Sequence, residues 1–316
     1  MVPTMAEKQR IVLTGATGLI GGAVAKELLK KGYSLVIFSR NPEAASQKMP
    51  GAIEYVAWQP QESGSWSAVI DGAYAVIHCA APSIFARRYT RSYAQETLMN
   101  RIVSTQGLVK ALARAETKPS VFISSASQGI YGFNIISDTL VDESTPIGTD
   151  YWAQDSKPWE DEALKAETIG IRTVVMRTGY VLSDEGGGFP YQVRQARKGQ
   201  RVISQPGNAY CSWIHITDEA RLYVFALENE LVRGPLNCTA PNPVTNQEYA
   251  NLLGKAVGKP IGLAPYFLVR LFTGKVAEVY ARQRRVVPQK ALNLGFSFEY
   301  ETLDKALDDL VPRLIA

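Results

Sequence analysis

Three glycines, Gly15, Gly18 and Gly21, recur at three-residue intervals near the start of the chain, spaced Gly-x-x-Gly-x-x-Gly. An apolar run that begins at Ile11 precedes them, and apolar residues at helical spacing follow as far as Gly32. Such glycines allow a tight exit from a strand, close approach of the backbone to a pyrophosphate and close packing of the next helix on a sheet. The first N–H groups of that helix would face the phosphates. The pattern therefore predicts a dinucleotide site on a strand, a glycine turn and a helix.

The next apolar run, residues 33–38, indicates the kind of dinucleotide. It ends in Ser39 and Arg40, and the first acidic residue after it is Glu43. An acid at this point would accept hydrogen bonds from the ribose hydroxyls of NAD, whereas an arginine can pair with a 2′-phosphate. We therefore predict NADP(H); the alternative is that Arg40 is a solvated residue after a strand.

Three hydroxyl side chains lie where a predicted strand ends or a helical segment begins, and we consider each of them for an active-site role. Ser124 ends an apolar run, Tyr131 follows it in a Tyr-Gly turn, and Tyr151 opens a later helical segment. Transfer of a hydride to or from a carbon that bears oxygen needs a proton donor or acceptor at that oxygen. The alternative roles are a strand-end cap for Ser124, a turn anchor for Tyr131 and an aromatic lip of the cleft for Tyr151.

Apolar runs and helical segments alternate along the chain in a way that must position these residues. Strands are expected at residues 53–58, 73–82, 120–127 and 173–179, with helices at 93–115, through 159–164 and from Trp213 onward. The alternation predicts an α/β fold with a doubly wound parallel sheet. Residues 58–60 are expected near the adenine. Beyond Pro241 we expect a helix capped by Thr245, then further helices with a short strand near residues 296–300.

The whole-chain composition excludes several classes of function. Basic residues exceed acidic ones by only four, and most of them are scattered along the chain. The one cluster, residues 282–285, we interpret as a solvated or phosphate-facing helix end. No nucleic-acid partner is therefore expected. Two histidines and three dispersed cysteines predict neither a metal site nor a disulfide framework. Without a signal peptide or a membrane-spanning run, the expected location is the cytoplasm or another reducing soluble compartment. The oligomeric state is left open.

Several ordered segments together resemble the short-chain dehydrogenase/reductase superfamily in its extended form, and its atypical branch labelled epimerase family protein in particular. They are the glycine motif, Ala80-Ala81, Ser124-Ser125, residues 177–182, 212–218, 234–246 and 285–298. The resemblance implies a Rossmann domain (1–182 and 211–240) with a smaller, mostly helical substrate portion (183–210 and 241–316). It also implies a small polar substrate that carries a carbonyl or hydroxyl group, nucleotide-linked substrates included. By position in the motifs, the cofactor contacts are expected at Gly15, Thr17, Gly18, Leu19, Ile20, Gly21, Ser39, Arg40, Ala80, Ala81, Pro82, Ser124, Thr178 and Gly179.

In that superfamily a tyrosine donates or accepts the proton at the substrate oxygen and a serine binds that oxygen, so the resemblance implies these roles for Tyr151 and for Ser124 or Ser125. One position departs from the pattern of the superfamily. A lysine normally stands four residues after the catalytic tyrosine and stabilises its phenolate, but four residues after Tyr151 is Asp155. A carboxylate there would disfavour the phenolate, and Lys157 lies beside Pro158. Two functions therefore remain open: an NADP(H)-dependent oxidoreductase or epimerase, or a non-catalytic NADP(H)-binding protein that senses redox state.

Overall fold

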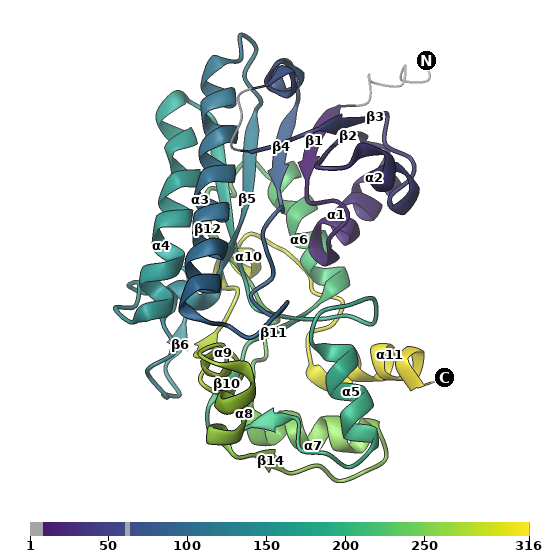
Figure 1. Cartoon of the computed structure of the whole chain (residues 1–316), viewed down its shortest axis with the longest axis vertical. Coiled ribbons are helices and arrows are strands. Elements are labelled where there is room, and N and C mark those ends of the chain that lie inside the picture. Colours follow the sequence, from purple (N-terminus) through teal and green to yellow (C-terminus); the bar gives the residue numbers. More distant parts are fainter. Residues whose placement is uncertain (1–8, 61–63, 316) are drawn as a thin grey trace.

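The computed structural model describes residues 9–60 and 64–315, and a seven-stranded parallel sheet organises them (Figure 1). The strand order is β12-β7-β5-β4-β1-β2-β3, and every neighbouring pair is parallel. The sheet strands are β1 (Arg10–Thr14), β2 (Ser34–Ser39), β3 (Glu54–Ala57), β4 (Ala75–His78), β5 (Val121–Ser127), β7 (Arg172–Thr178) and β12 (Gly234–Cys238).

The helices cover both faces of this sheet. Apolar residues of α1 and α6 form one core with one face, and residues of α3 form a second core with the other face, where α4 lies beside α3 (Figure 1). The α-helices are α1 (Leu19–Lys30), α2 (Pro42–Lys48), α3 (Arg91–Arg114), α4 (Tyr151–Leu164), α5 (Phe189–Arg197), α6 (Ile216–Glu228), α7 (Asn246–Ala256), α8 (Tyr266–Thr273), α9 (Ala277–Ala281), α10 (Gln289–Asn293) and α11 (Leu303–Ile315). The expected α/β fold with a doubly wound parallel sheet is confirmed.

A smaller lobe has a hydrophobic core of its own, built by α5, α7 and α11 around Trp213. Thr245 and Glu248 form the capping box that starts α7. Short strands pair within and around this lobe: β6 (Leu140–Val141), β8 (Tyr180–Leu182), β9 (Ile203–Ser204), β10 (Tyr210–Cys211), β11 (Trp213–His215), β13 (Val244–Thr245), β14 (Leu263–Ala264) and β15 (Arg285–Val286).

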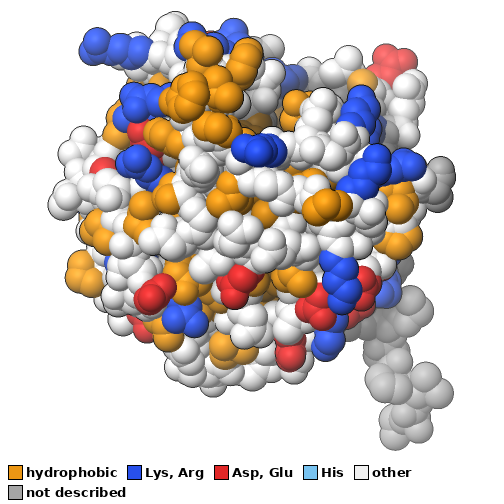
Figure 2. Space-filling view, turned by 90° about the horizontal axis from the view of Figure 1, so that it is seen from below, with side chains coloured by type: hydrophobic (Ala, Val, Ile, Leu, Met, Phe, Trp, Pro, Cys, Tyr) orange, Lys and Arg blue, Asp and Glu red, His pale blue; other side chains and the backbone are white. Residues whose placement is uncertain are grey.

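The exposed hydrophobic side chains include a group on α8 of this lobe. The large apolar side chains Phe267, Leu271 and Phe272 are more than half exposed, and α8 has no buried residue. Figure 2, which looks at the molecule from below, shows hydrophobic side chains interspersed with Lys and Arg. None of the helices in the described part of the chain is both long enough and apolar enough to cross a membrane.

Two sequence-based expectations differ from the structure. The segment expected to begin a helix at Trp213 is first a strand, and the helix starts at Ile216. The strand expected near residues 296–300 is absent from the described chain. Phe296 and Phe298 are both buried, which gives the alternating pattern of a strand, but the N–H groups of the next two residues bind the carboxylate of Asp218 instead of a neighbouring strand.

Candidate cofactor site

The glycine turn joins β1 to α1 at the point where the strand order reverses, between β1 and β4. Gly15 has a φ of +76°, and a Cβ there would lie 2.6 Å from the backbone nitrogen of Ala80. A Cβ on Gly21 would lie 2.2 Å from the carbonyl oxygen of Gly15. Both positions therefore require glycine. Open parallel sheets bind ligands at such a switch point, at the carboxyl ends of the strands.

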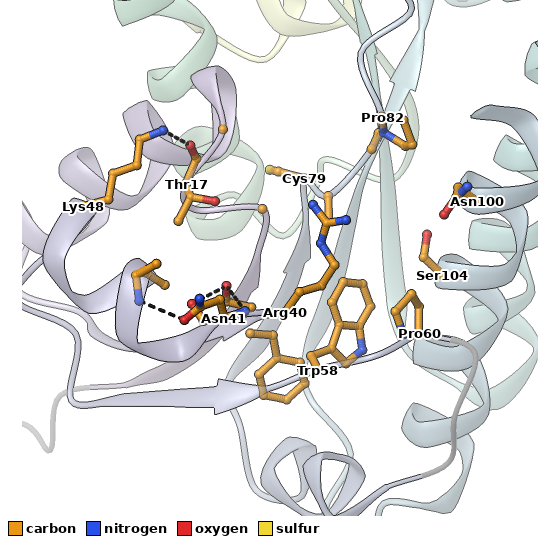
Figure 3. A pocket seen from close by; sticks show the side chains of 18 of the residues that line it. Thr17, Arg40, Asn41, Lys48, Trp58, Pro60, Cys79, Pro82, Asn100 and Ser104 are labelled. Atoms are coloured by element: carbon orange, nitrogen blue, oxygen red, sulfur yellow. Dashed lines mark hydrogen bonds between the residues drawn. The ribbon is translucent and has the colours of Figure 1, made fainter. Parts of the chain in front are cut away.

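A cavity of about 680 Å³ opens in front of this turn (Figure 3). Its walls come from the glycine turn, the ends of β2, β3 and β4, and one face of α3. The predicted cofactor residues that line it are Gly15, Thr17, Gly18, Ser39, Arg40, Ala80, Ala81 and Pro82.

The β2 end of the cavity is basic. Arg40 and Lys48 both line it, and the Lys48 ammonium donates a 2.7 Å hydrogen bond to the Thr17 carbonyl in the glycine turn (Figure 3). Asn41 accepts a 3.0 Å hydrogen bond from the N–H of Ala44, which caps α2 and fixes the turn that carries Arg40. Two cations are therefore available to a phosphate at this end.

An aromatic wall lies beside the basic end. Trp58 lines the cavity with Pro60, where the sequence led us to expect the adenine. Its ring contacts those of Trp66 and His78 edge-on, at centroid distances of 6.3 and 6.0 Å. His78 is itself buried between the hydroxyls of Thr14 and Ser104, and burial lowers its pKa to about 3. This histidine therefore stays neutral and stiffens the cavity wall.

The remaining predicted cofactor residues are not among those that line the cavity. The residues of this set are Leu19, Ile20, Gly21, Ser124, Thr178 and Gly179. Ser124 is fully buried, and its hydroxyl donates to the carbonyl of Ser125 at 3.2 Å. Thr178 donates to the carboxylate of Glu219 at 2.8 Å.

Tyr131 belongs to a buried network away from the cavity lining. Its hydroxyl donates to Asn237 at 2.8 Å and accepts from Arg177 at 2.7 Å, and Arg177 forms a two-pronged ion pair with Glu160. Burial raises the pKa of Tyr131 to about 12. These contacts are those of a turn anchor, the alternative role considered for Tyr131, and this residue is not among those that line the cavity.

Tyr151 is the first residue of α4 and is partly exposed, with the Lys275 ammonium 4.6 Å from the centre of its ring. Partial burial, Tyr89 and the carboxylate of Asp155 hold the pKa of the Tyr151 phenol above its ordinary value. Lys157 pairs with Asp161 on the exposed side of α4, so it does not take the place of the missing lysine.

A largely buried arginine of α3 lies beside Asp155. Arg101 of α3 is 4.0 Å from the carboxylate of Asp155 and donates a 3.3 Å hydrogen bond to the carbonyl of Pro82 in the cavity wall. Its guanidinium also lies 4.9 Å from the ring centre of Trp159. Arg101 therefore partly offsets the charge of Asp155 beside Tyr151.

Several lining residues had escaped the sequence analysis. Besides Lys48, they include Glu96, Asn100 and Ser104, which recur every four residues and so share one face of α3. That spacing is the signal that could have identified them. Among the described residues, no group of histidine, cysteine and acidic side chains could hold a metal ion, and all three cysteines are free.

Fold and cavity together define a dinucleotide-binding Rossmann protein of the extended short-chain dehydrogenase/reductase type. Residues 11–238 match the model of the NAD dependent epimerase/dehydratase family, and residues 264–310 match a domain of unknown function, DUF1731. The chain belongs to the NAD dependent epimerase/dehydratase family.

Relatives of similar length match almost the whole chain. Epimerase family protein YfhF of Bacillus subtilis is 30% identical over 95% of this chain and 97% of its own, and epimerase family protein ML0860 of Mycobacterium leprae is 32% identical over 95% of each. The crystal structure of human epimerase family protein SDR39U1 (isoform 2) with NADPH superposes with a TM-score of 0.82 at 26% identity, covering 96% of this chain and 99% of the human one.

Proposed function

We propose that this protein binds NADP(H) in the cavity and uses it to reduce or oxidise a small polar substrate at a carbonyl or hydroxyl carbon. The observation that carries the proposal is the pair of cations, Arg40 and Lys48, at the end of a cavity whose other landmark is the glycine turn. The likeness to the human protein that was solved with NADPH supports the same cofactor.

The residues of the cavity fit the parts of that cofactor in order. The first N–H groups of α1 would bind the pyrophosphate, and Arg40 and Lys48 would bind the 2′-phosphate. Trp58 would pack against one side of the adenine. When bound, the cofactor supplies or accepts a hydride. We assign the cofactor to residues 1–182 and 211–240, and the substrate to residues 183–210 and 241–316, because this second set has most of a separate hydrophobic core.

Replacement of Arg40 tests the cofactor assignment. We expect Arg40→Met to raise the Kd for NADPH about 10- to 100-fold, because a charge-assisted hydrogen bond to the 2′-phosphate is worth about 1.5–3 kcal/mol. The Kd for NADH, which has no such phosphate, should change little. Titration by the fluorescence of the reduced nicotinamide measures both constants.

The matched control is Lys30→Met, which removes an exposed cation from the end of α1, away from the cavity lining. Equal loss of NADPH and NADH binding in Arg40→Met would contradict a role for Arg40 at the 2′-phosphate. Failure of the wild-type protein to bind either nucleotide would remove the cofactor proposal altogether.

Tyr151 is the remaining candidate for a proton donor to the substrate oxygen. Because its phenol stays protonated at neutral pH, it suits donation to a carbonyl that is being reduced better than removal of a hydroxyl proton. We expect Tyr151→Phe to lower kcat for NADPH-dependent carbonyl reduction about 100-fold or more, with the Kd for NADPH unchanged. Reduced-cofactor absorbance, followed over a panel of carbonyl compounds and nucleotide sugars, measures the rate.

Tyr191→Phe, a half-exposed tyrosine on α5, serves as the control. A second function, redox sensing without catalysis, is favoured by Asp155 at the position of the expected lysine. Tight NADPH binding with no turnover of any compound in the panel would support the sensor. Full activity of Tyr151→Phe would instead assign the proton to another donor.

A further inference from the structure

Glu219 is a fully buried carboxyl group close to the cofactor cavity, and the function proposed above does not use it. It lies in the first turn of α6, and its side chain has no exposed surface. One carboxyl oxygen accepts the 2.8 Å hydrogen bond from Thr178, while the other is buried and, within residues 9–60 and 64–315, has no hydrogen-bond partner. A buried polar atom without a partner calls for an explanation.

The groups that face Glu219 carry no positive charge. They are Thr178 at the end of β7, Cys79 after β4, Cys238 at the end of β12 and Tyr223 one turn further along α6. No ion pair in the described part of the chain includes Glu219, and burial raises its pKa to about 8. The carboxyl group is therefore mostly protonated at neutral pH.

The neighbouring acid on the same helix behaves differently. Asp218 accepts hydrogen bonds from the backbone N–H groups of Glu299 and Tyr300 and pairs with Arg221. These backbone donors and the arginine thus compensate the charge of Asp218, on the side of α6 that faces residues 299 and 300. The contrast singles out Glu219 as the acid of α6 that lacks compensation.

The position of Glu219 relative to the cofactor follows from the strand order. Arg40 and Trp58 place the adenosine end of the cavity over β2 and β3, on one side of the switch point. A dinucleotide that crosses the switch point must lay its nicotinamide half over the carboxyl ends of β4, β5 and β7. Thr178 ends β7, and Cys79 lines the cavity just beyond β4. Glu219, which binds Thr178 and interacts with Cys79, therefore lies next to the strand ends over which the nicotinamide half would lie.

We propose that Glu219 sets the preference of this site between the reduced and oxidised cofactor and couples the binding of NADP⁺ to the release of a proton. The inference rests on the proposed function, because it needs NADP(H) in the cavity. In the coupled step the O–H bond of the Glu219 carboxyl group breaks, the proton passes to solvent and the carboxylate remains beside the oxidised ring. No electron moves in this step.

The coupling has an electrostatic origin. The oxidised nicotinamide ring carries a positive charge and the reduced ring is neutral. A carboxylate in a buried, low-dielectric position attracts the positive ring, whereas a protonated carboxyl group does not. Protonated Glu219 therefore favours NADPH and ionised Glu219 favours NADP⁺. By linkage, bound NADP⁺ must favour the ionised form by the same factor.

The test measures the Kd values of NADPH and NADP⁺ between about pH 6.5 and pH 9 for the wild-type protein, Glu219→Gln and Glu228→Gln. The control residue, Glu228, lies at the exposed end of the same helix and pairs with Lys31. For the wild type and the control, we expect the ratio of the NADP⁺ Kd to the NADPH Kd to fall about fivefold or more as the pH rises. For Glu219→Gln the ratio should stay level. The phosphate groups titrate alike in both ligands and cancel in the ratio.

Titration calorimetry in buffers of different ionisation enthalpy gives an independent reading. At neutral pH, NADP⁺ should release a fraction of a proton from the wild-type protein and less from Glu219→Gln. A wild-type ratio that does not change with pH, or that changes equally in Glu219→Gln, would overturn the proposal while leaving the cofactor assignment intact. If neither nucleotide binds the wild type, both proposals fail.

Thermal denaturation shows whether Glu219 titrates at all, even without cofactor. Because its pKa in the folded state, about 8, is above the ordinary value of 4.5, the folded protein binds more protons than the unfolded chain between these values. Stability should therefore fall as the pH rises through this range, and this contribution should be missing from Glu219→Gln. Identical pH profiles of Tm would contradict a buried, protonated Glu219.

Discussion

Gly21→Ala should lose most of its affinity for NADPH and part of its stability. The added methyl group would lie 2.2 Å from the carbonyl oxygen and 2.6 Å from the carbonyl carbon of Gly15. Both are backbone atoms of the turn, so no side chain can rotate away, and α1 must move off the turn. We expect a loss of about 1–3 kcal/mol in the free energy of unfolding, as for overpacked cores.

The same displacement would move the N–H groups of α1 away from the phosphates. We expect a Kd for NADPH at least about tenfold higher, since each 1.4 kcal/mol of lost interaction is a factor of ten. Fluorescence titration and chemical denaturation measure the two effects. Gly186→Ala is the matched control, because a Cβ there meets only the Leu19 side chain at 3.6 Å, an ordinary contact. Wild-type binding by Gly21→Ala would show that the turn is not the phosphate site.

Glu160→Gln should be the most destabilising of the substitutions considered. Glu160 and Arg177 are both buried, and their two hydrogen bonds measure 2.6 and 3.0 Å. Glutamine keeps one acceptor oxygen for Arg177, but its NH2 group replaces the second oxygen and the negative charge is lost, so the guanidinium stays buried without a counter-ion. Breaking a buried ion pair from one side costs about 3–5 kcal/mol. Thermal and chemical denaturation should show the loss directly.

An exposed ion pair on the same helix provides the control. Lys157 and Asp161 pair at the surface of α4, and Asp161→Asn should change the stability by less than about 1 kcal/mol. Equal effects of the two substitutions would contradict the view that burial makes the Arg177 pair essential. NADPH binding by the folded fraction of Glu160→Gln should persist, since neither partner lines the cavity.

The glycine turn and the basic end of the cavity could be predicted because their signals are local. Gly15 and Gly21 show their role through spacing within one strand, turn and helix, and Arg40 follows its strand directly. Pro82, far along the chain, lines the same cavity as the glycine turn, because strands that neighbour β1 end at the same edge of the sheet.

Other features depend on contacts that no local pattern contains. Tyr131 lies right after a strand that carries hydroxyls, but its partners Arg177 and Asn237 are 46 and 106 residues away, and they turn it from the cavity. Lys48 reaches Thr17 only because α2 folds back beside the glycine turn. In the sequence Glu219 looks like an ordinary first-turn acid of a helix, and only its complete burial in the fold makes it unusual.

The strand order also has a consequence for synthesis on the ribosome. Strand β12 pairs with β7, and α6 covers the apolar face of α1. Both contacts can form only after residues 216–238 have left the ribosome. A nascent chain that ends before Ile216 therefore carries an uncovered hydrophobic face, a feature that makes partly folded chains aggregate. This protein should need chaperone protection for most of its translation, and truncations before Cys238 should be insoluble.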